Sequence, residues 1–343
     1  DKWLLFLRSY SSLRSFPCAA SHASMESAHG KRKKNCNAAK EKEEKLMCSI
    51  LCYAGKDVTK ETMEGYLLKT KMRGPDAQQV VETEFGYLGF ARLAIMGLTP
   101  DGMQPFQRDG SWVICNGEIY GFRKIKKELE ERGYQFQSGS DCEVLLPLYE
   151  EYGLEMFSHL DAEYACVLYD HKSGKLIAAR DQIGIRPLFY GYSKSGKIAF
   201  ASEAKNLIGW VDEVRAFPPG SYYYDGKFVK YEDIAAVHGY VHEDIDVITK
   251  NIHDKLTEGV KKRLDADAPL GFLLSGGLDS SLVCAIAADI LKKPIRTFAI
   301  GMDTDAIDLK YAKEVADFIT VDNNSSAVAA VIYALDDGEI KFE

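Results

Sequence analysis

The segment YEDIAAVHGYVHEDID, residues 231–246, divides the chain into two parts with different patterns of apolar residues. Before it, short runs rich in β-branched and aromatic residues are joined by tight Ser-Gly turns, which is typical of antiparallel sheets. After it, apolar strands alternate with helices, which indicates a parallel sheet. We therefore predict two domains, at 47–230 and 247–319, with residues 231–246 as their linker. A chain of 343 residues is long enough for both.

The first domain is predicted to be α+β, with helices covering stacked antiparallel sheets. Its strands are expected at residues 49–55, 112–120, 162–170, 175–181, 187–192 and 197–203. Its helices are expected at 124–133, at 140–153 with a cap at Ser140 or Asp141, and within 67–78, where Gly74-Pro75 should end a helix. The strand at 112–120 is expected to run into a tight Asn-Gly turn.

The second domain is predicted to be α/β. An amphipathic helix is expected at 247–264, then a strand, a Gly-rich turn and a helix within 271–290, a strand at 296–301 and a helix at 307–319. The two ends of the chain fit neither pattern. Residues 1–46 are expected to be disordered, and both a transit peptide and sequence upstream of a misplaced start fit them. The tail at 320–343 is expected to match nothing in the rest of the pattern.

The composition excludes several classes of protein. The chain has no run near the ~18 apolar residues that a membrane span needs, so we expect a soluble protein without a membrane partner. A formal charge of -8 argues against a nucleic-acid partner. The eight cysteines form no CxxC pair, and most of those after Cys48 lie in apolar surroundings. This pattern favours reduced, buried thiols in a cytoplasmic protein, with organellar import left open by the leader.

The pair Met47-Cys48 has a chemistry that depends on where the chain begins. If residues up to Met47 are removed, Cys48 carries both a thiol and a free α-amino group. The thiolate is the attacking species in cysteine chemistry, and an amine with a pKa near 8 on the same residue can act as its general base. Cys48 is therefore a candidate nucleophile.

The stretch SGGLDSS, residues 275–281, lies between a buried strand and a helix. Its glycines allow a sharp turn and close approach of a ligand, and the helix N-terminus behind them suits a phosphate. It lacks the Lys of a Walker A loop, so ordinary P-loop chemistry is disfavoured. A merely tight strand-to-helix turn would explain the glycines, but not the Asp and three Ser around them.

These motifs resemble two known families. SGGLDSS is similar to the loop of the ATP pyrophosphatases, which split ATP between its α and β phosphates. The first domain resembles the N-terminal-nucleophile glutamine amidotransferases, and both together resemble the glutamine-hydrolysing asparagine synthetase family. The amidotransferase signatures occur in family order as MCSI (47–50), RGPD (73–76), ARLAI (91–95), NGEIY (116–120), GSDCE (139–143), ARDQIGIRPL (179–188), ASEAK (201–205) and FPPGSY (217–222).

The resemblance implies a glutamine site. Cys48 would be the nucleophile, with Asn116 and Gly117 as the oxyanion hole. Arg92 would bind the glutamine α-carboxylate, and Glu118 and Asp141 its α-ammonium group. Further glutamine contacts are implied at Leu93, Ala94, Ile95 and Met96. Taken singly, Arg92 could be a surface ion pair, Asn116-Gly117 a hairpin turn and Asp141 a helix cap.

The resemblance also implies an ATP site. ATP would be a substrate and Mg²⁺ would accompany it, with metal ligands that the sequence leaves unknown. The implied ATP-binding residues are Leu274, Ser275, Gly276, Gly277, Leu278, Asp279, Ser280, Ser281 and Ile300. Glutamine, aspartate and ATP would be the small-molecule partners, and a homodimer is left open. The family activity would be formation of a C–N bond in asparagine synthesis.

This chain departs from the family in a few places. Lys71 and Met72 replace an Arg-His pair, and Gly97 stands where many members have Asp. The resemblance is expected to end near Ile319, with the rest of a synthetase domain missing, so the chain is expected to retain at most the glutaminase half. A non-catalytic binding module with the same fold, or an amidotransferase for another acceptor, is the alternative.

Overall fold

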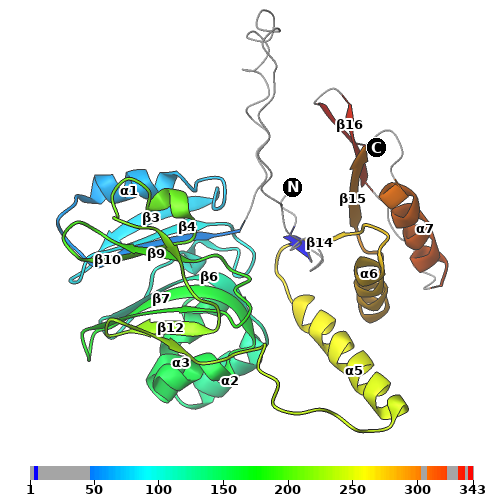
Figure 1. The fold of residues 1–343 in the computed structure, drawn as a ribbon, viewed down its shortest axis with the longest axis horizontal. Helices are drawn as coiled ribbons and strands as arrows, with labels where there is room; N and C mark the ends of the chain where they lie inside the picture. The colour runs from blue at the N-terminus through cyan, green and yellow to red at the C-terminus, as the bar shows by residue number, and fades with distance from the viewer. Residues whose placement is uncertain (1–3, 7–46, 303–306, 323–330, 337–338, 343) are drawn as a thin grey trace, which may run out of the picture. The chain divides into compact units, whose positions relative to one another are not determined.

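The computed structural model describes residues 4–6, 47–302, 307–322, 331–336 and 339–342. The chain divides into two compact units, coloured by residue number in Figure 1. One unit, here called the sandwich unit, is Glu43–Val241, and the other, the parallel-sheet unit, combines Asp1–Lys42 with His242–Glu343. The division at Val241 falls inside the segment that was predicted to be the linker.

The sandwich unit contains two six-stranded antiparallel sheets. The first has the order β11-β9-β10-β2-β4-β3, from Arg215–Ala216, Phe189–Tyr192, Ile198–Ala201, Ser49–Tyr53, Tyr87–Arg92 and Ala77–Glu82. The second has the order β13-β12-β8-β7-β6-β5, from Lys227–Lys230, Ser221–Tyr224, Lys175–Arg180, Ala162–Asp170, Ser111–Ile119 and Phe106–Arg108. Figure 1 shows the two sheets as stacked layers. This confirms the predicted fold class.

Helices cover the outer face of each sheet. Helix α1 (Lys60–Leu68) packs on the first sheet through Met63 and Leu67. The second sheet is covered by α2 (Phe122–Glu131), η3 (Asp141–Val144), α3 (Leu145–Tyr152), η4 (Gly153–Glu155) and α4 (Met156–His159). Between the sheets lies a core of alternate strand residues, including Ile50, Phe90, Ile114, Val167 and Phe200. Each such side chain, when fully buried, stabilises the fold by roughly 1.5–3 kcal/mol.

Two local predictions in this unit were wrong. The helix expected to end at Gly74 ends at Leu68, because Thr70 donates both its backbone N–H and its hydroxyl to the carbonyl of Leu67 and closes a tight turn. Gly74 is required for a different reason, since a Cβ there would lie 2.1 Å from the backbone of Ala91 in β4.

The second error concerns the predicted Asn-Gly turn. Asn116 and Gly117 lie inside β6, which stays paired with β7 as far as Ile119 opposite Ala162. Neither residue has the positive φ that a two-residue hairpin turn of this sequence would need. Asn116 and Gly117 are therefore extended strand residues within β6 and do not form a turn.

The parallel-sheet unit contains a five-stranded sheet in the order β1-β14-β15-β16-β17, of which the first four strands are parallel. The strands are Leu4–Phe6, Leu270–Leu273, Thr297–Met302, Val331–Asp336 and Glu339–Phe342, and the helices are α5 (Ile245–Arg263), α6 (Leu278–Leu291) and α7 (Ile307–Asp322). Residues of α5, α6 and α7 pack with Phe272 and Ala299 into one core. The alternation of strands and helices agrees with the α/β prediction.

Both ends of the chain contribute strands to this sheet, contrary to expectation. Leu4–Phe6, within the leader predicted to be disordered, form β1 and pair with β14, while 1–3 and 7–46 lie outside the described residues. In the tail, β16 pairs with β15 in parallel and β17 pairs with β16 in antiparallel fashion.

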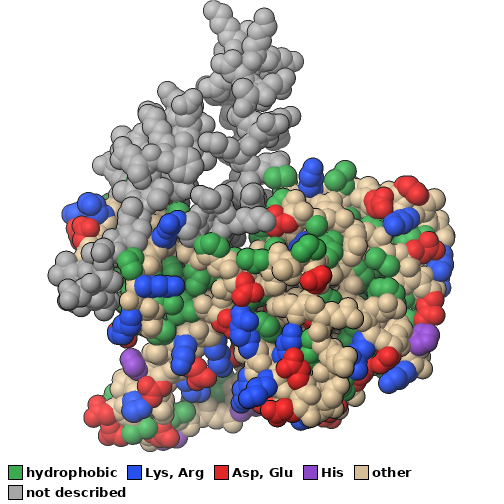
Figure 2. All heavy atoms as spheres, turned by 180° about the vertical axis from the view of Figure 1, so that it is seen from behind, with side chains coloured by type: hydrophobic (Ala, Val, Ile, Leu, Met, Phe, Trp, Pro, Cys, Tyr) green, Lys and Arg blue, Asp and Glu red, His purple; other side chains and the backbone are tan. Residues whose placement is uncertain are grey.

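Charged side chains of both signs are interspersed on the face seen in Figure 2. Such mixing provides no broad field of one sign that would attract a polyanion to this face. Across the described ranges, every helix is too short or too polar to span a membrane.

Candidate active site

Cys48 lies directly before β2 and packs at the edge of the core between the two sheets. Its sulfur is 3.3 Å from the backbone nitrogen of Leu93, which donates to it, and 3.3 Å from the Leu93 carbonyl oxygen. Burial raises the pKa of the Cys48 thiol to about 12; the carboxylates of Glu118 and Asp141 act in the same direction, and the Leu93 N–H opposes it. The thiol is therefore neutral at pH 7 and needs a base before it can attack.

Arg73, from the RGPD motif, holds the backbone of Cys48 in place. Its Nε donates to the Cys48 carbonyl oxygen at 3.1 Å, and its Nη1 lies 3.2 Å from a carboxylate oxygen of Glu203. Asp76 of the same motif accepts from the backbone nitrogen of Ala94 at 2.9 Å. Through these two residues the RGPD motif connects Cys48 to the loop after β4.

Arg92 ends β4 and is buried, so it is not a surface ion pair. Its two Nη atoms donate to the carbonyls of Thr99, at 2.8 Å, and of Gly97. Arg92 therefore shapes the loop that follows it. That loop begins at Leu93 beside the thiol and continues through the buried residues Ala94, Ile95 and Met96.

The departure at Gly97 has a steric explanation. Gly97 has a φ of +57°, and a Cβ there would lie 2.6 Å from the backbone nitrogen of Ser140. A Cβ on Gly139 would in turn lie 3.2 Å from the Gly97 Cα. The loop after β4 thus packs closely on the GSDCE segment, and this chain leaves no room for the Asp that many family members carry at position 97.

Asn116 is the clearest sign of a binding site in the sandwich unit. Its side chain is 1% exposed, and neither its amide oxygen nor its amide nitrogen has a hydrogen-bond partner among the described residues. Leaving a buried polar group unpaired typically costs about 1–3 kcal/mol. Such an exception calls for an explanation, and a ligand that pairs with the amide supplies one.

Gly117 follows Asn116 in β6 and lies opposite Tyr164 of β7. A Cβ at Gly117 would lie 2.6 Å from the carbonyl oxygen of Glu163 and 2.8 Å from the Cβ of Tyr164. A side chain fits at position 117 only if β6 and β7 move apart there. Cys142 reinforces this arrangement, because its thiol donates to the Gly117 carbonyl at 3.8 Å.

Gly117→Ala is expected to lower the free energy of unfolding by about 1–3 kcal/mol, because the strands must separate to admit the methyl group. Urea denaturation of the variant measures this change. Gly65→Ala is the matched control: it lies in α1 with nothing within 4 Å of its Cβ, so it should stabilise by about 0.5–1 kcal/mol. Equal stability of Gly117→Ala and the parent chain would contradict the close approach.

Two carboxyl groups lie near the thiol, that of Asp141, which is buried, and that of Glu118, which is half-buried. Asp141 accepts from the backbone nitrogen of Ile119 at 2.7 Å, so it ties η3 to β6 and is more than a helix cap. Burial raises the pKa of Asp141, although several backbone N–H groups oppose this. Burial also raises the pKa of Glu118, and the nearby Asp141 adds to it. A bound cation would favour the ionised form of both groups.

The structure adds Arg186 and Glu163, which the sequence analysis did not single out. Arg186 is 7% exposed; its Nη2 lies 3.4 Å from a carboxylate oxygen of Glu163, and its Nη1 lies 2.8 Å from the sulfur of Met47. Tyr120 donates to the other oxygen of Glu163 at 2.5 Å. The only available signal was the ARDQIGIRPL motif, in which Asp181 accepts four backbone N–H groups and fixes the loop that carries Arg186.

In the parallel-sheet unit, the SGGLDSS loop connects β14 to α6 as predicted. Leu274 is buried after β14, and Gly276 has a φ of +77°. The hydroxyls of Ser275, Ser280 and Ser281 bond within the loop, two of them to the Gly277 carbonyl. The N-terminus of α6 has no side-chain cap, which leaves its first N–H groups available to an anion.

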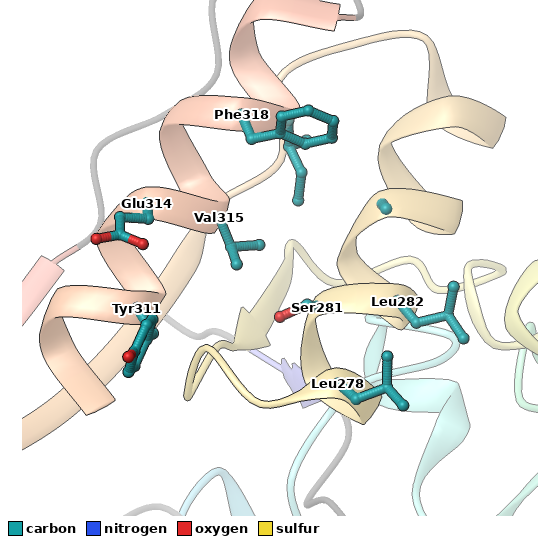
Figure 3. A pocket seen from close by; sticks show the side chains of 9 residues that line it. Leu278, Ser281, Leu282, Tyr311, Glu314, Val315 and Phe318 are labelled. Atoms are coloured by element: carbon teal, nitrogen blue, oxygen red, sulfur yellow. The ribbon is translucent and has the colours of Figure 1, made fainter. Parts of the chain in front are cut away.

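The remaining predicted ATP residues lie in α6 and β15, and the side chain of one of them is not described. Leu278, Asp279 and Ser280 form the first turn of α6. Ile300 lies in β15, opposite Tyr333 of β16, and its side chain lies outside the described residues. Beside the loop, α6 and α7 form a cavity of about 360 Å³, whose lining is mostly apolar (Figure 3). Its labelled lining residues are Leu278, Ser281, Leu282, Tyr311, Glu314, Val315 and Phe318.

The stacked sheets and the cysteine that precedes β2 define the fold class of the N-terminal-nucleophile amidotransferases. Comparison with known families agrees with this. The family described as "Glutamine amidotransferase domain" matches residues 47–223, and the chain belongs to this family. Residues 251–335 match the family described as "Asparagine synthase". This second match continues past Ile319 through most of β16, so the expectation that the resemblance ends near Ile319 was wrong.

Several curated proteins are similar to this chain. A probable glutamine-hydrolysing asparagine synthetase of Acanthamoeba polyphaga mimivirus is 40% identical over 81% of this chain and 56% of its own length. Asparagine synthetase 2 of Arabidopsis thaliana is 35% identical over 84% and 54%. Asparagine synthetase B of Escherichia coli is 33% identical over 77% and 52%. The chain thus spans about half the length of these relatives.

Among solved structures, a glutamine phosphoribosylpyrophosphate amidotransferase from B. subtilis is similar over 84% of this chain and 81% of that chain. Its TM-score is 0.49 at 15% identity.

Proposed function

We propose that this chain hydrolyses glutamine to glutamate and ammonia at Cys48, once Cys48 is the N-terminal residue. The observation that carries the proposal is the pairing of a cysteine thiol with a buried, unpartnered amide, that of Asn116, in a unit that belongs to the glutamine amidotransferase family. The reduced, buried cysteines fit a cytoplasmic location.

The reaction would begin when the α-amine of Cys48 takes the proton of its own thiol. The sulfur attacks the side-chain carbonyl carbon of glutamine, a C–S bond forms, and the oxyanion accepts hydrogen bonds from the Asn116 amide and the Gly117 backbone nitrogen. Collapse of the intermediate breaks the C–N bond, and the proton held by the α-amine leaves with ammonia. Water then hydrolyses the thioester and releases glutamate.

Free glutamine would be recognised by charge. Arg92 lies beside the loop after β4 and would bind the α-carboxylate through donors that its bonds to Gly97 and Thr99 leave available. Glu118 and Asp141 would bind the α-ammonium group, and their raised pKa values indicate that they gain from a cationic partner. Leu93, Ala94, Ile95 and Met96 would line the substrate from the same loop.

By similarity to the asparagine synthetases, the parallel-sheet unit would use ammonia, ATP and aspartate to form asparagine, AMP and pyrophosphate. The residues present fit an ATP phosphate chain: a Cβ at Gly277 would have only the Ser275 hydroxyl within 4 Å, and α6 offers an uncapped N-terminus. Leu274, the residues from Ser275 to Ser281, and Ile300 would contact the nucleotide. Bound ATP would bring Mg²⁺; among the described residues, no cluster of three or more His, Cys, Asp or Glu forms a separate metal site.

An electrophilic glutamine analogue tests the glutaminase directly. The chain is cleaved before Cys48 with a site-specific protease and treated with a chloroketone analogue of glutamine, and the adduct is located by peptide mass spectrometry. We expect one adduct, on Cys48, with protection by excess glutamine. Cys52, four residues away and fully buried, is an internal control that should stay unlabelled. A cleaved, folded chain with no adduct on Cys48 would indicate a binding module instead of an enzyme.

A further inference from the structure

Arg186 contacts the side chain of Met47, the residue that is absent from the proposed active form of the protein. Its Nη1 lies 2.8 Å from the sulfur of Met47, which is five covalent bonds from the nitrogen of Cys48. With bonds of about 1.5 Å, Nη1 of Arg186 lies within roughly 10 Å of that nitrogen. Removal of Met47 takes away the acceptor of Nη1, and Nε has no partner among the described residues.

The charges around Cys48 make the protonation state of a new α-amine sensitive to Arg186. The groups that face this region come from six parts of the sandwich unit: Arg73 and Asp76, Arg92, Glu118, Asp141, Glu163 with Arg186, and Glu203. Nearby carboxylates favour an ammonium ion, whereas guanidinium groups disfavour it. A protonated amine cannot act as the base for its own thiol.

The other two guanidinium groups are already engaged. Arg73 is bound to the Cys48 carbonyl and to Glu203, and Arg92 is bound to two loop carbonyls. Within the described part of the chain, Arg186 has one ion pair, with Glu163 at 3.4 Å, and its Nη1 loses its acceptor when Met47 is removed. Its loop is held rigidly by Asp181, so the side chain starts from a fixed backbone position.

We propose that Arg186 is a positioning residue that keeps the α-amine of mature Cys48 unprotonated near neutral pH. This inference rests on the proposed glutaminase, in which that amine is the base. The positive charge of Arg186 opposes the pull of Glu118, Asp141 and Glu163 on the proton. In the uncleaved chain, Nη1 of Arg186 donates to the Met47 sulfur instead.

Two readouts test the proposal on the chain cleaved before Cys48. The α-amine is titrated directly through its ¹⁵N chemical shift in protein labelled with [¹⁵N]cysteine, and kcat/KM for glutamine is measured against pH. Arg186→Gln should raise the pKa of the amine and move the acid limb of kcat/KM upward by about one pH unit. On the acid side of the limb, activity should therefore fall about tenfold. Arg186→Lys keeps the charge and should restore most of the limb.

A second variant, expected to shift the acid limb of kcat/KM in the opposite direction, distinguishes the proposed effect from a folding defect. Glu163→Gln removes the carboxylate paired with Arg186 and should move the limb downward. Arg132 is an exposed arginine directly after α2 and pairs with Glu151 of α3, so Arg132→Gln should leave the limb unchanged. An amine pKa that is the same in the wild type and in Arg186→Gln, or a loss of kcat/KM that is equal at every pH, would overturn the proposal. The NMR titration decides it even if the cleaved wild type fails to hydrolyse glutamine, which would defeat only the proposed function.

Discussion

Cleavage directly before Cys48 is expected to raise glutaminase turnover by about 10²–10⁴-fold over the intact chain, because it supplies the general base. In the intact chain the Cys48 nitrogen is an amide, and the thiol has a pKa of about 12. The fraction of thiolate at pH 7 is then on the order of 10⁻⁵. Release of ammonia from glutamine, measured before and after proteolysis, gives the ratio.

The pH dependence distinguishes this explanation from simple unblocking of the site. Any residual activity of the intact chain should rise about tenfold per pH unit up to pH about 12, since the thiolate must form without a base. The cleaved chain should instead level off near the pKa of the amine. Cleavage one residue earlier, before Met47, is the control: it frees an amine on the wrong residue and should not activate. Equal activity of the intact chain and the chain cleaved before Cys48 would rule out the amine as base.

Asn116→Ala in the cleaved chain is expected to lower kcat by about 10²–10³-fold with little change in KM, since the amide binds the oxyanion more strongly than the substrate carbonyl. The same change should leave the free energy of unfolding unchanged or raise it by about 1 kcal/mol, because it removes two buried polar atoms that have no partner among the described residues. Steady-state kinetics and urea denaturation measure the two effects.

Asn206→Ala is the matched control for this opposite response. Asn206 is also fully buried, and its amide oxygen has no partner among the described residues, but its amide nitrogen donates to the Tyr66 carbonyl at 2.8 Å and to the Thr70 hydroxyl at 3.2 Å. Its loss should destabilise by about 1–3 kcal/mol and leave kcat largely unchanged. If Asn116→Ala destabilised the protein as much as Asn206→Ala while retaining full kcat, Asn116 would be a structural residue.

Most elements of the fold could be predicted from local patterns. Strands such as β7 and β8 alternate side chains between two cores, and helices such as α2 and α5 carry a regular polar face. The errors arose where a distant contact decides the local conformation. The sequence suggested that Gly74 ends a helix. In the structure, a glycine is required there because the backbone of β4 leaves no room for a Cβ. Asn116-Gly117 looked like a turn, but pairing with β7 keeps β6 extended.

The candidate site was predictable in its chemistry and less so in its geometry. The Met-Cys pair and the ordered motifs predicted Cys48, Arg92 and Asn116 as site residues, and their roles stay predictions. Arg186 and Glu163 could not have been singled out, because they lie 23 positions apart on a loop and a strand and carry no chemical signature of their own. Only their ion pair beside Met47 indicates a role.

By itself, the sequence determined which groups can react and which two fold classes carry them, because thiol chemistry, glycine permissiveness and apolar periodicity are properties of residues and their neighbours along the chain. The tertiary structure decided the protonation states and the unpaired donors: the raised thiol pKa, the unpartnered Asn116 amide and the position of Arg186. These depend on burial and on charges from distant strands, because electrostatic energies are set by distance through space and by exclusion of water.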